Sequence, residues 1–306
     1  MKYPFILLLT LLLGSCAGRQ VSSTKNIGSQ EYDAPWNTPI ISHRATDYKF
    51  SYAGTIGPWD RGIQEDSLNF PSIPGLVHKA VYAMCPVDTC VAEYAVIALR
   101  CPQEQPLLDW MSEKVCDFAN NCSVGNGRER YMGKALGIQK KSLGSADEIC
   151  HYYMDQLWHL YDDWVCSGEG DPGSFNEQSG VLIVDCWRTR DLCTFYRADW
   201  YDWMSCGDNT KESYITVNAK TGKEMLLEDL VRPEKFDDLS ALMLSHLINV
   251  KGEAPVESND VLARANGCGL IREGLIIYFY PYNLGCGADG QYNAVIPYEE
   301  LEGILK

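Results

Sequence analysis

Hydrophobic positions recur along this chain in two patterns, and blocks of one pattern alternate with blocks of the other. Apolar runs rich in β-branched and aromatic residues predict strands. They cover residues 91–99, 181–187, 193–203, 212–218, 274–280 and 292–296. Apolar side chains spaced three and four positions apart predict amphipathic helices. These cover residues 107–120, the stretch from Ser145 to the glycines near 170, 236–249 and 298–305.

Local signals support the starts of two helices. Pro106 stands where a first helical residue needs no N–H donor. Ser145-Ala146-Asp147-Glu148 matches a capping box, in which serine and glutamate satisfy free backbone N–H groups. Strands joined in meanders, with helices between the groups, are typical of the α+β class. We therefore predict an antiparallel sheet packed by helices.

The amino terminus has the pattern of an export signal. Lys2 precedes the apolar run 3–13, and Gly14 and Ser15 precede Cys16. The run is shorter than the roughly 20 apolar residues that span a bilayer. Leu13-Gly14-Ser15-Cys16 resembles the lipobox of bacterial lipoproteins. That resemblance implies cleavage before Cys16, acylation of Cys16 with fatty chains such as palmitate, and anchoring to a membrane. A cleaved signal whose cysteine joins a disulfide is the alternative.

The sequence after Cys16 bears on organisation and location. Residues 1–16 form the predicted lipoprotein signal peptide, and 17–44 form a flexible tether with no sustained periodicity. Residues 17–20 lack the acidic cluster that accompanies surface export in some bacterial groups. We therefore expect a lipid-anchored protein of the cell envelope, held at the outer membrane and facing the periplasm.

Charge narrows the range of partners. The formal net charge is −15 over 306 residues, which argues against nucleic acid because phosphates require a basic surface. The same charge disfavours electrostatic adhesion to anionic lipid. An acidic surface can speed encounter with a cationic partner, or it can simply maintain solubility.

Cysteine content adds a further expectation. Thirteen cysteines are present, and an even number remains once Cys16 is set aside. Export places them where disulfides persist, and none of the twelve lies in the C-x-x-C spacing of zinc or redox sites. We therefore expect a disulfide-rich domain, with buried free thiols as the alternative. A two-residue turn at Thr189 and Arg190 would place Cys186 opposite Cys193, which makes this pair a candidate disulfide.

Two constellations could carry chemistry. His151, Asp155 and His159 lie four residues apart on the helix from Ser145, a spacing that suits metal ligands. A hydrated helix face explains the same residues, and no H-E-x-x-H motif is present. No G-x-S-x-G elbow, Walker loop or dinucleotide fingerprint occurs either. We therefore assign no metal, cofactor or catalytic residue.

Aromatic residues supply the second constellation. Trp200, Tyr201 and Trp203 alternate with Asp199 and Asp202 near the end of a predicted strand. Exposed rings beside carboxylates can hold a sugar. Strand aromatics more often belong to the core. The three aromatic residues are therefore candidate ligand-binding residues, and the core interpretation is the alternative.

The carboxyl-terminal third resembles a known family. The ordered segments are 214–218, Thr221-Gly222-Lys223, 226–230, 274–282 and 296–301. Together they resemble the domain of unknown function that ends the anti-sigma factor RsiV and the deacetylase-associated protein PdaC. The resemblance covers residues 180–306, and residues 45–179 would form a separate α+β region, a degenerate form of the domain that usually precedes it.

The same resemblance has limits and implications. The family's glycine–alanine–histidine loop is absent here, and its later tyrosine–alanine–alanine–glycine-like step has become Gly287-Ala288-Asp289-Gly290. Each of these two altered loops contains a cysteine, Cys206 in the first and Cys286 in the second, which makes them a second candidate disulfide. In RsiV the domain is implied to recognise lysozyme, and in PdaC it accompanies a separate catalytic domain. Nothing in this chain resembles a deacetylase domain. What the resemblance implies is a binding or envelope-sensing module rather than the specific regulatory circuit of RsiV.

Together these observations predict a lipid-anchored envelope protein that binds a macromolecule, either a cationic lysozyme-like protein or cell-wall peptidoglycan. An envelope glycan hydrolase or deacetylase with an unrecognised site is one alternative. A purely structural envelope component is the other.

Overall fold

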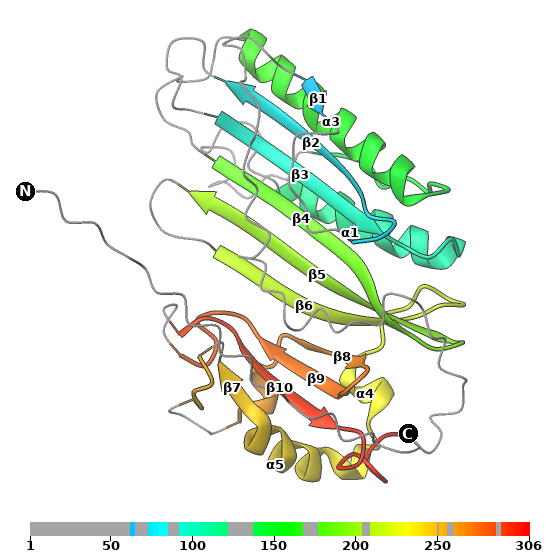
Figure 1. The fold of residues 1–306 in the computed structure, drawn as a ribbon, viewed down its shortest axis with the longest axis vertical. Helices are drawn as coiled ribbons and strands as arrows, with labels where there is room; N and C mark the ends of the chain where they lie inside the picture. Colours follow the sequence, from blue (N-terminus) through cyan, green and yellow to red (C-terminus); the bar gives the residue numbers. More distant parts are fainter. Residues whose placement is uncertain are drawn as a thin grey trace, which may run out of the picture.

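A computed structural model of the chain describes residues 62–64, 73–84, 92–121, 137–167, 177–203, 209–249, 251–255, 260–285 and 289–306. It contains two sheets (Figure 1). The first sheet has six strands in the order β1-β2-β3-β4-β5-β6. Their bounds are β1 (Gly62–Gln64), β2 (Val77–Met84), β3 (Ala92–Arg100), β4 (Glu177–Arg188), β5 (Leu192–Trp203) and β6 (Asn209–Asn218).

The first sheet is antiparallel except at its centre, where β3 and β4 run parallel. A parallel pair needs a crossover connection, usually helical. Here the connection contains α1 (Gln105–Asn121) and α3 (Ala146–Ser167). Both helices cover the same face of the first sheet (Figure 1). Their apolar sides and the facing strand residues form one buried cluster, which includes Leu107, Met111, Tyr153, Ile183 and Phe195.

The other face of the first sheet packs against a second, four-stranded antiparallel sheet in the order β7-β10-β9-β8. Its strands are β7 (Leu247–Asn249), β8 (Gly267–Ile271), β9 (Gly274–Phe279) and β10 (Tyr292–Pro297), and α4 (Leu227–Leu230) and α5 (Phe236–His246) accompany it. Short 3-10 turns lie at Pro233–Lys235 and Leu262–Arg264. Where the sheets meet, the backbone N–H of Leu270 donates to the Thr216 hydroxyl at 2.8 Å.

The free edge of β6 is covered by side-chain and backbone contacts. Gln291 accepts a hydrogen bond from the Glu212 N–H at 3.0 Å and donates to the Glu212 carbonyl at 2.9 Å. Further along the strand, Met225 N–H donates to the Thr216 carbonyl at 2.8 Å. Exposed strand edges invite pairing with other chains. These contacts satisfy part of the β6 edge within the molecule.

The α+β class is confirmed, but the expected antiparallel arrangement is wrong for the first sheet, which is mixed because β3 and β4 run parallel. The hydrophobic patterns of the sequence correctly predicted the positions of two helices, α1 and α3, and of six strands, β3, β4, β5, β6, β9 and β10. The predicted boundary at residue 180 lies within β4, which pairs with β3 from Gln178 to Val184. The division of the chain into 45–179 and 180–306 stays a prediction.

Two predicted helices differ from the structure. The helix expected over 236–249 ends at His246, and the last residues form β7, which pairs with β10. Ile248 lies in this pairing. A β-branched side chain such as isoleucine is better accommodated in a strand than in the interior of a helix. The helix expected over 298–305 is instead a run of turns, and Gly303 with φ +78° interrupts any continuous helical path.

The candidate disulfide between Cys186 and Cys193 is not supported, because both are free thiols. The turn is centred one residue later than expected, and Arg188 pairs with Cys193. A bulge between Asp185 and Trp187 then changes the side on which Cys186 lies. As a result Cys186 packs in the cluster between the sheets, whereas Cys193 packs in the cluster beneath the helices. The candidate pair Cys206 and Cys286 lies outside the described residues.

The expected disulfide-rich character is likewise unsupported by the cysteines that the structure describes. The free thiols are Cys101, Cys116, Cys150, Cys186, Cys193 and Cys268. Burial is the largest influence on each thiol and raises its pKa, for Cys268 to about 12. A thiolate is the reactive form of cysteine. These side chains therefore behave as small core hydrophobes rather than as nucleophiles.

Burial of these thiols predicts a loss of stability in alkali. Unfolded thiols release protons near their ordinary pKa of 9.0, whereas the buried Cys150 keeps its proton. The native state therefore binds more protons above that pH, and stability falls as the pH rises. Between pH 9 and 10 we expect a loss of about 1 kcal/mol per buried thiol. Urea unfolding at several pH values measures how steeply the free energy of unfolding falls with pH in wild type and in Cys150→Ala. The fall should be less steep in the variant, and an equally steep fall would contradict the prediction for Cys150.

Candidate functional site

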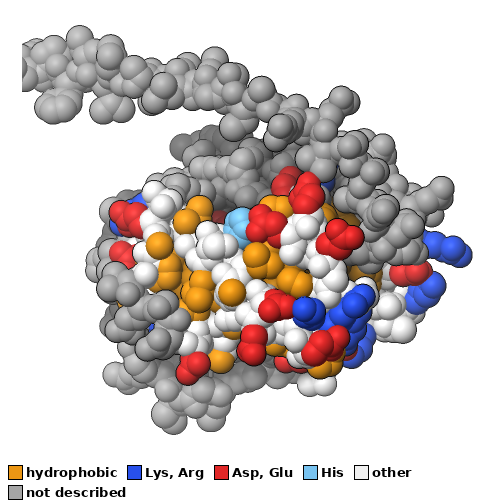
Figure 2. Space-filling view, turned by 90° about the horizontal axis from the view of Figure 1, so that it is seen from below, with side chains coloured by type: hydrophobic (Ala, Val, Ile, Leu, Met, Phe, Trp, Pro, Cys, Tyr) orange, Lys and Arg blue, Asp and Glu red, His pale blue; other side chains and the backbone are white. Residues whose placement is uncertain are grey.

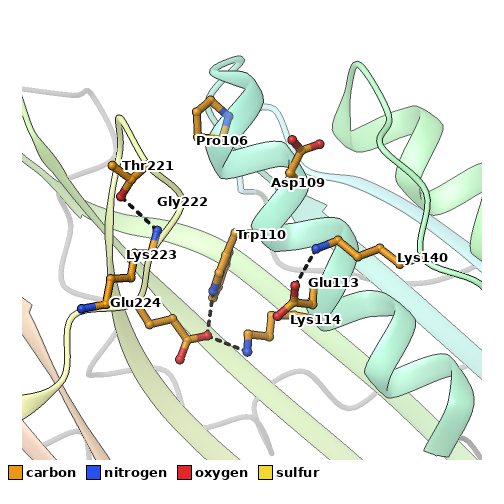
Figure 3. A pocket seen from close by; sticks show the side chains of 10 residues that line it. All are labelled: Pro106, Asp109, Trp110, Glu113, Lys114, Lys140, Thr221, Gly222, Lys223 and Glu224. Atoms are coloured by element: carbon orange, nitrogen blue, oxygen red, sulfur yellow. Dashed lines mark hydrogen bonds and ion pairs between the residues drawn. The ribbon is translucent and has the colours of Figure 1, made fainter.

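An open cleft of about 570 Å³ lies between the amino-terminal half of α1 and the turn that follows β6. We call it the α1 cleft (Figure 3). Its lining residues come from three parts of the chain that are far apart in sequence. They are Pro106, Asp109, Trp110, Glu113 and Lys114 on α1, Lys140 on the segment before α3, and Thr221, Gly222, Lys223 and Glu224 on the turn.

The turn has a fixed backbone shape. Asn218 accepts hydrogen bonds on its side chain from the N–H groups of Lys220 and Thr221, at 3.0 and 3.1 Å. Gly222 has φ +70°, a left-handed conformation that glycine adopts without steric cost. A Cβ atom at Gly222 would lie 2.6 Å from the Pro106 carbonyl oxygen. The turn therefore lies directly against the start of α1, and only a glycine fits there without displacement.

Trp110 stands at the centre of the cleft wall (Figure 3). Its ring stacks on Phe195, with centroids 4.6 Å apart, and it is only 4% exposed. Its Nε1–H donates to Glu224 Oε1 at 2.8 Å, and Lys114 Nζ lies 2.6 Å from the same oxygen. Glu224 thereby ties the turn to α1 through two charge-assisted contacts.

Lys140, the third contribution to the lining, belongs to the segment 137–143, which is hydrogen-bonded to α1. The Asn120 side chain accepts from the Ile138 N–H and donates to the Ile138 carbonyl, each at 2.9 Å. Ser112 Oγ donates to the Lys141 carbonyl at 2.5 Å. These contacts hold the segment in place and bring Lys140 Nζ within 2.5 Å of Glu113.

Two carboxyl groups of the cleft have lowered pKa values. Hydrogen bonds from Ser142 and then Gln105 lower the pKa of Asp109. The hydrogen bond from Lys140 is the main influence that lowers the pKa of Glu113. Both groups are therefore ionised at neutral pH. Asp109 and Glu113 therefore offer negative charge to a ligand beside the positive charge of Lys140.

The predicted site residues lie elsewhere. Trp200, Tyr201 and Trp203 belong to β5, and Trp200 and Tyr201 pair with both β4 and β6. Their side chains lie outside the described residues, so the ligand-binding hypothesis for them stays a prediction. Cys16, the predicted lipidation site, also lies outside the described part of the chain.

The polar stripe on α3 is a surface feature in the structure. His151 and His159 are exposed, and His159 Nε2 lies 3.6 Å from Asp155 Oδ2. Within the described ranges no group of three histidine, cysteine or acidic side chains is placed to hold a metal ion. No described helix is long and apolar enough to cross a membrane.

Sequence reasoning missed most of the α1 cleft. It identified Thr221-Gly222-Lys223 only through a family resemblance, and the α1 residues only as parts of a helix. The available signal was the polar side of that helix, where Asp109, Glu113 and Lys114 follow at helical spacing. Their meeting with Lys140 and Glu224 depends on the tertiary fold, which no local pattern encodes.

Two solved structures that are similar to this chain are DUF3298 family proteins. Neither a protein-family model nor a curated protein matches this chain. One similar solved structure is a DUF3298 family member from Bacteroides fragilis, with 13% identity, a TM-score of 0.47, and coverage of 81% of this chain and 95% of that chain. A DUF3298 family protein from Pseudomonas aeruginosa has 13% identity, a TM-score of 0.46, and coverage of 76% and 94%. Neither description names an activity, a ligand or a partner.

Proposed function

We propose that this protein is a lipid-anchored component of the bacterial cell envelope that binds cell-wall peptidoglycan. The single observation that carries the binding proposal is the α1 cleft, which three distant segments assemble through specific hydrogen bonds and ion pairs. Clefts of several hundred Å³ with convergent polar groups are typical of ligand sites. The anchor itself rests on the sequence from Leu13 to Cys16, and the finer family assignment rests on the resemblance to the RsiV- and PdaC-type domain.

Binding is favoured over hydrolysis by Asp109 and Glu113 by the lowered pKa values of these two carboxyl groups in the α1 cleft. Glycoside hydrolysis generally needs one carboxyl group with a raised pKa as proton donor and a second one as a base or nucleophile. The pKa values of both Asp109 and Glu113 are lowered instead. Both carboxylates are therefore suited to accept hydrogen bonds from a ligand.

Co-sedimentation with purified peptidoglycan sacculi tests the function. We expect the full chain to sediment with sacculi and the double variant Lys140→Met/Glu113→Gln to lose at least tenfold in affinity. The matched control is Lys235→Met/Asp238→Asn, an ion pair at 2.7 Å with similar exposure that lies outside the α1 cleft. The control should bind as wild type does. Failure of the wild-type chain to sediment would contradict the proposed function.

Anchoring has its own test. Metabolic labelling with a fatty acid should label the wild-type chain and not Cys16→Ser, and only the wild type should partition with membranes. An unlabelled wild-type chain would contradict the anchor without affecting the cleft.

A cationic lysozyme-like protein is the second candidate ligand, favoured by the net charge of −15. Such a partner would bind more weakly as salt increases. Figure 2 shows acidic side chains interspersed with hydrophobic ones over the face that carries α5, rather than gathered into one patch. On this face, therefore, no single acidic patch offers a docking surface. A salt-sensitive complex with lysozyme that survives the double variant would support the second candidate.

A further inference from the structure

The charges that line the α1 cleft balance, in contrast to those of the whole chain. Three carboxylates, those of Asp109, Glu113 and Glu224, face three lysines, Lys114, Lys140 and Lys223. The formal charge of the chain is −15. A purely anionic or purely cationic ligand would meet groups of its own sign in this cleft. A ligand that carries both signs would meet complementary groups.

A neutral sugar finds no aromatic platform among the lining residues. Sugar recognition commonly uses the exposed face of an aromatic ring, because its apolar surface covers the C–H face of the sugar. Trp110 is the one aromatic side chain in the lining, and its ring stacks on Phe195 and is 4% exposed. Its Nε1–H is already bonded to Glu224. The α1 cleft therefore recognises charge rather than a ring face.

The ion pair between Lys140 and Glu113 is suited to partner exchange. The side chains of Lys140 and Glu113 are 47% and 46% exposed. Pairs at such exposure contribute about 0–1 kcal/mol, so separating them costs little. A ligand carboxylate can take the place of Glu113 on Lys140, while a ligand ammonium group binds Glu113. Two ion pairs then replace one, and the total charge of the cleft stays unchanged.

We propose that the α1 cleft binds a zwitterionic peptide, a short chain with a free ammonium group and a free carboxylate, through Glu113 and Lys140. This proposal rests on the proposed function and deepens it, because it assigns the cleft to the peptide part of the cell wall rather than to the glycan. Lys140 is the carboxylate-binding residue and Glu113 the ammonium-binding residue.

Isothermal titration of the full chain at low ionic strength tests this assignment. The probes are the dipeptide alanyl-alanine, its N-acetyl form, its carboxamide form, and the neutral sugar N,N′-diacetylchitobiose. We expect the free dipeptide to bind and each blocked form to bind at least tenfold more weakly. Equal binding of a blocked form, or stronger binding of the sugar, would overturn the proposal.

Variants distinguish the two contacts. Lys140→Met should weaken the free dipeptide at least fivefold and leave the weaker binding of the carboxamide form unchanged, because that form lacks the carboxylate. Glu113→Gln should likewise weaken binding of the free dipeptide at least fivefold. It should leave the weaker binding of the N-acetyl form unchanged, because that form lacks the ammonium group. Lys235→Met and Asp238→Asn serve as matched controls and should bind as wild type does. A chain that sediments with sacculi but does not bind the dipeptide would overturn this inference and leave the proposed function in place.

Discussion

Replacement of Asp185 by alanine is expected to lower the free energy of unfolding by about 3–5 kcal/mol. Asp185 Oδ1 lies 2.6 Å from Arg100 Nε, and the two side chains are 3% and 8% exposed. Arg100 also donates to the backbone carbonyl of Asp185. Without the carboxylate, the guanidinium group remains buried beside β4 without its charge partner. Urea denaturation of wild type and Asp185→Ala measures the loss.

A double variant separates the cost of an uncompensated charge from the value of the pair. Arg100→Met/Asp185→Leu removes both charges and restores apolar volume, so its stability should lie within about 2 kcal/mol of wild type. Two results would contradict this account of the buried ion pair: a loss of less than about 1 kcal/mol in the free energy of unfolding of Asp185→Ala, or a double variant as unstable as Asp185→Ala.

Replacement of Gly222 by alanine is expected to cost about 3 kcal/mol and to weaken ligand binding. The left-handed conformation of Gly222 costs an alanine about 1–2 kcal/mol. The new Cβ would also lie 2.6 Å from the Pro106 carbonyl oxygen, which adds a strain of about 1–3 kcal/mol. Relief of this contact must move the turn away from α1 and change the shape of the α1 cleft.

Gly303 supplies the matched control. Its φ of +78° is close to the +70° of Gly222, but a Cβ at Gly303 meets no atom within 4 Å. Gly303→Ala should therefore show the backbone cost alone and leave peptide binding unchanged. The same loss of stability in both alanine variants would mean that the turn does not press on α1 as described.

The sequence predicted much of the fold because its signals are local. The capping residues at Ser145 correctly placed the start of α3, where the Ser145 hydroxyl accepts from the Glu148 N–H at 3.1 Å. The expected partner of the Glu148 carboxylate shifted by one residue, to the N–H of Gly144 at 2.9 Å. Such contacts span few residues, and a pattern within one segment suffices to indicate them.

The register of the strands and the sheet to which a segment belongs could not be predicted from the sequence, because both depend on the tertiary structure. The bulge near Cys186 changes which face each residue occupies, and no periodic pattern marks it. Helical spacing over 236–249 conceals a change from α5 to β7, because the pairing of β7 with β10 overrides local propensity. Ile248 lies in this segment and is part of strand β7 because β7 pairs with β10.

The α1 cleft was beyond sequence reasoning for the same reason. Glu224 is separated from Trp110 by 114 positions, and Lys140 from Glu113 by 27. Charged residues are numerous in this chain, so no single one of them stands out in the sequence. Their common location follows from the tertiary fold, which places Gly222 of the turn against Pro106 at the start of α1.

The most direct test of the central claim is a lysine-reactivity measurement on the full chain, with and without saturating muropeptide. Mass spectrometry after brief acetylation reports the modification rate of each lysine. The account predicts that Lys140 becomes at least fivefold less reactive with the muropeptide bound, while Lys235, whose exposure is similar to that of Lys140, keeps its rate. Unchanged reactivity at Lys140 under conditions where the muropeptide is bound would show that the ligand site lies elsewhere.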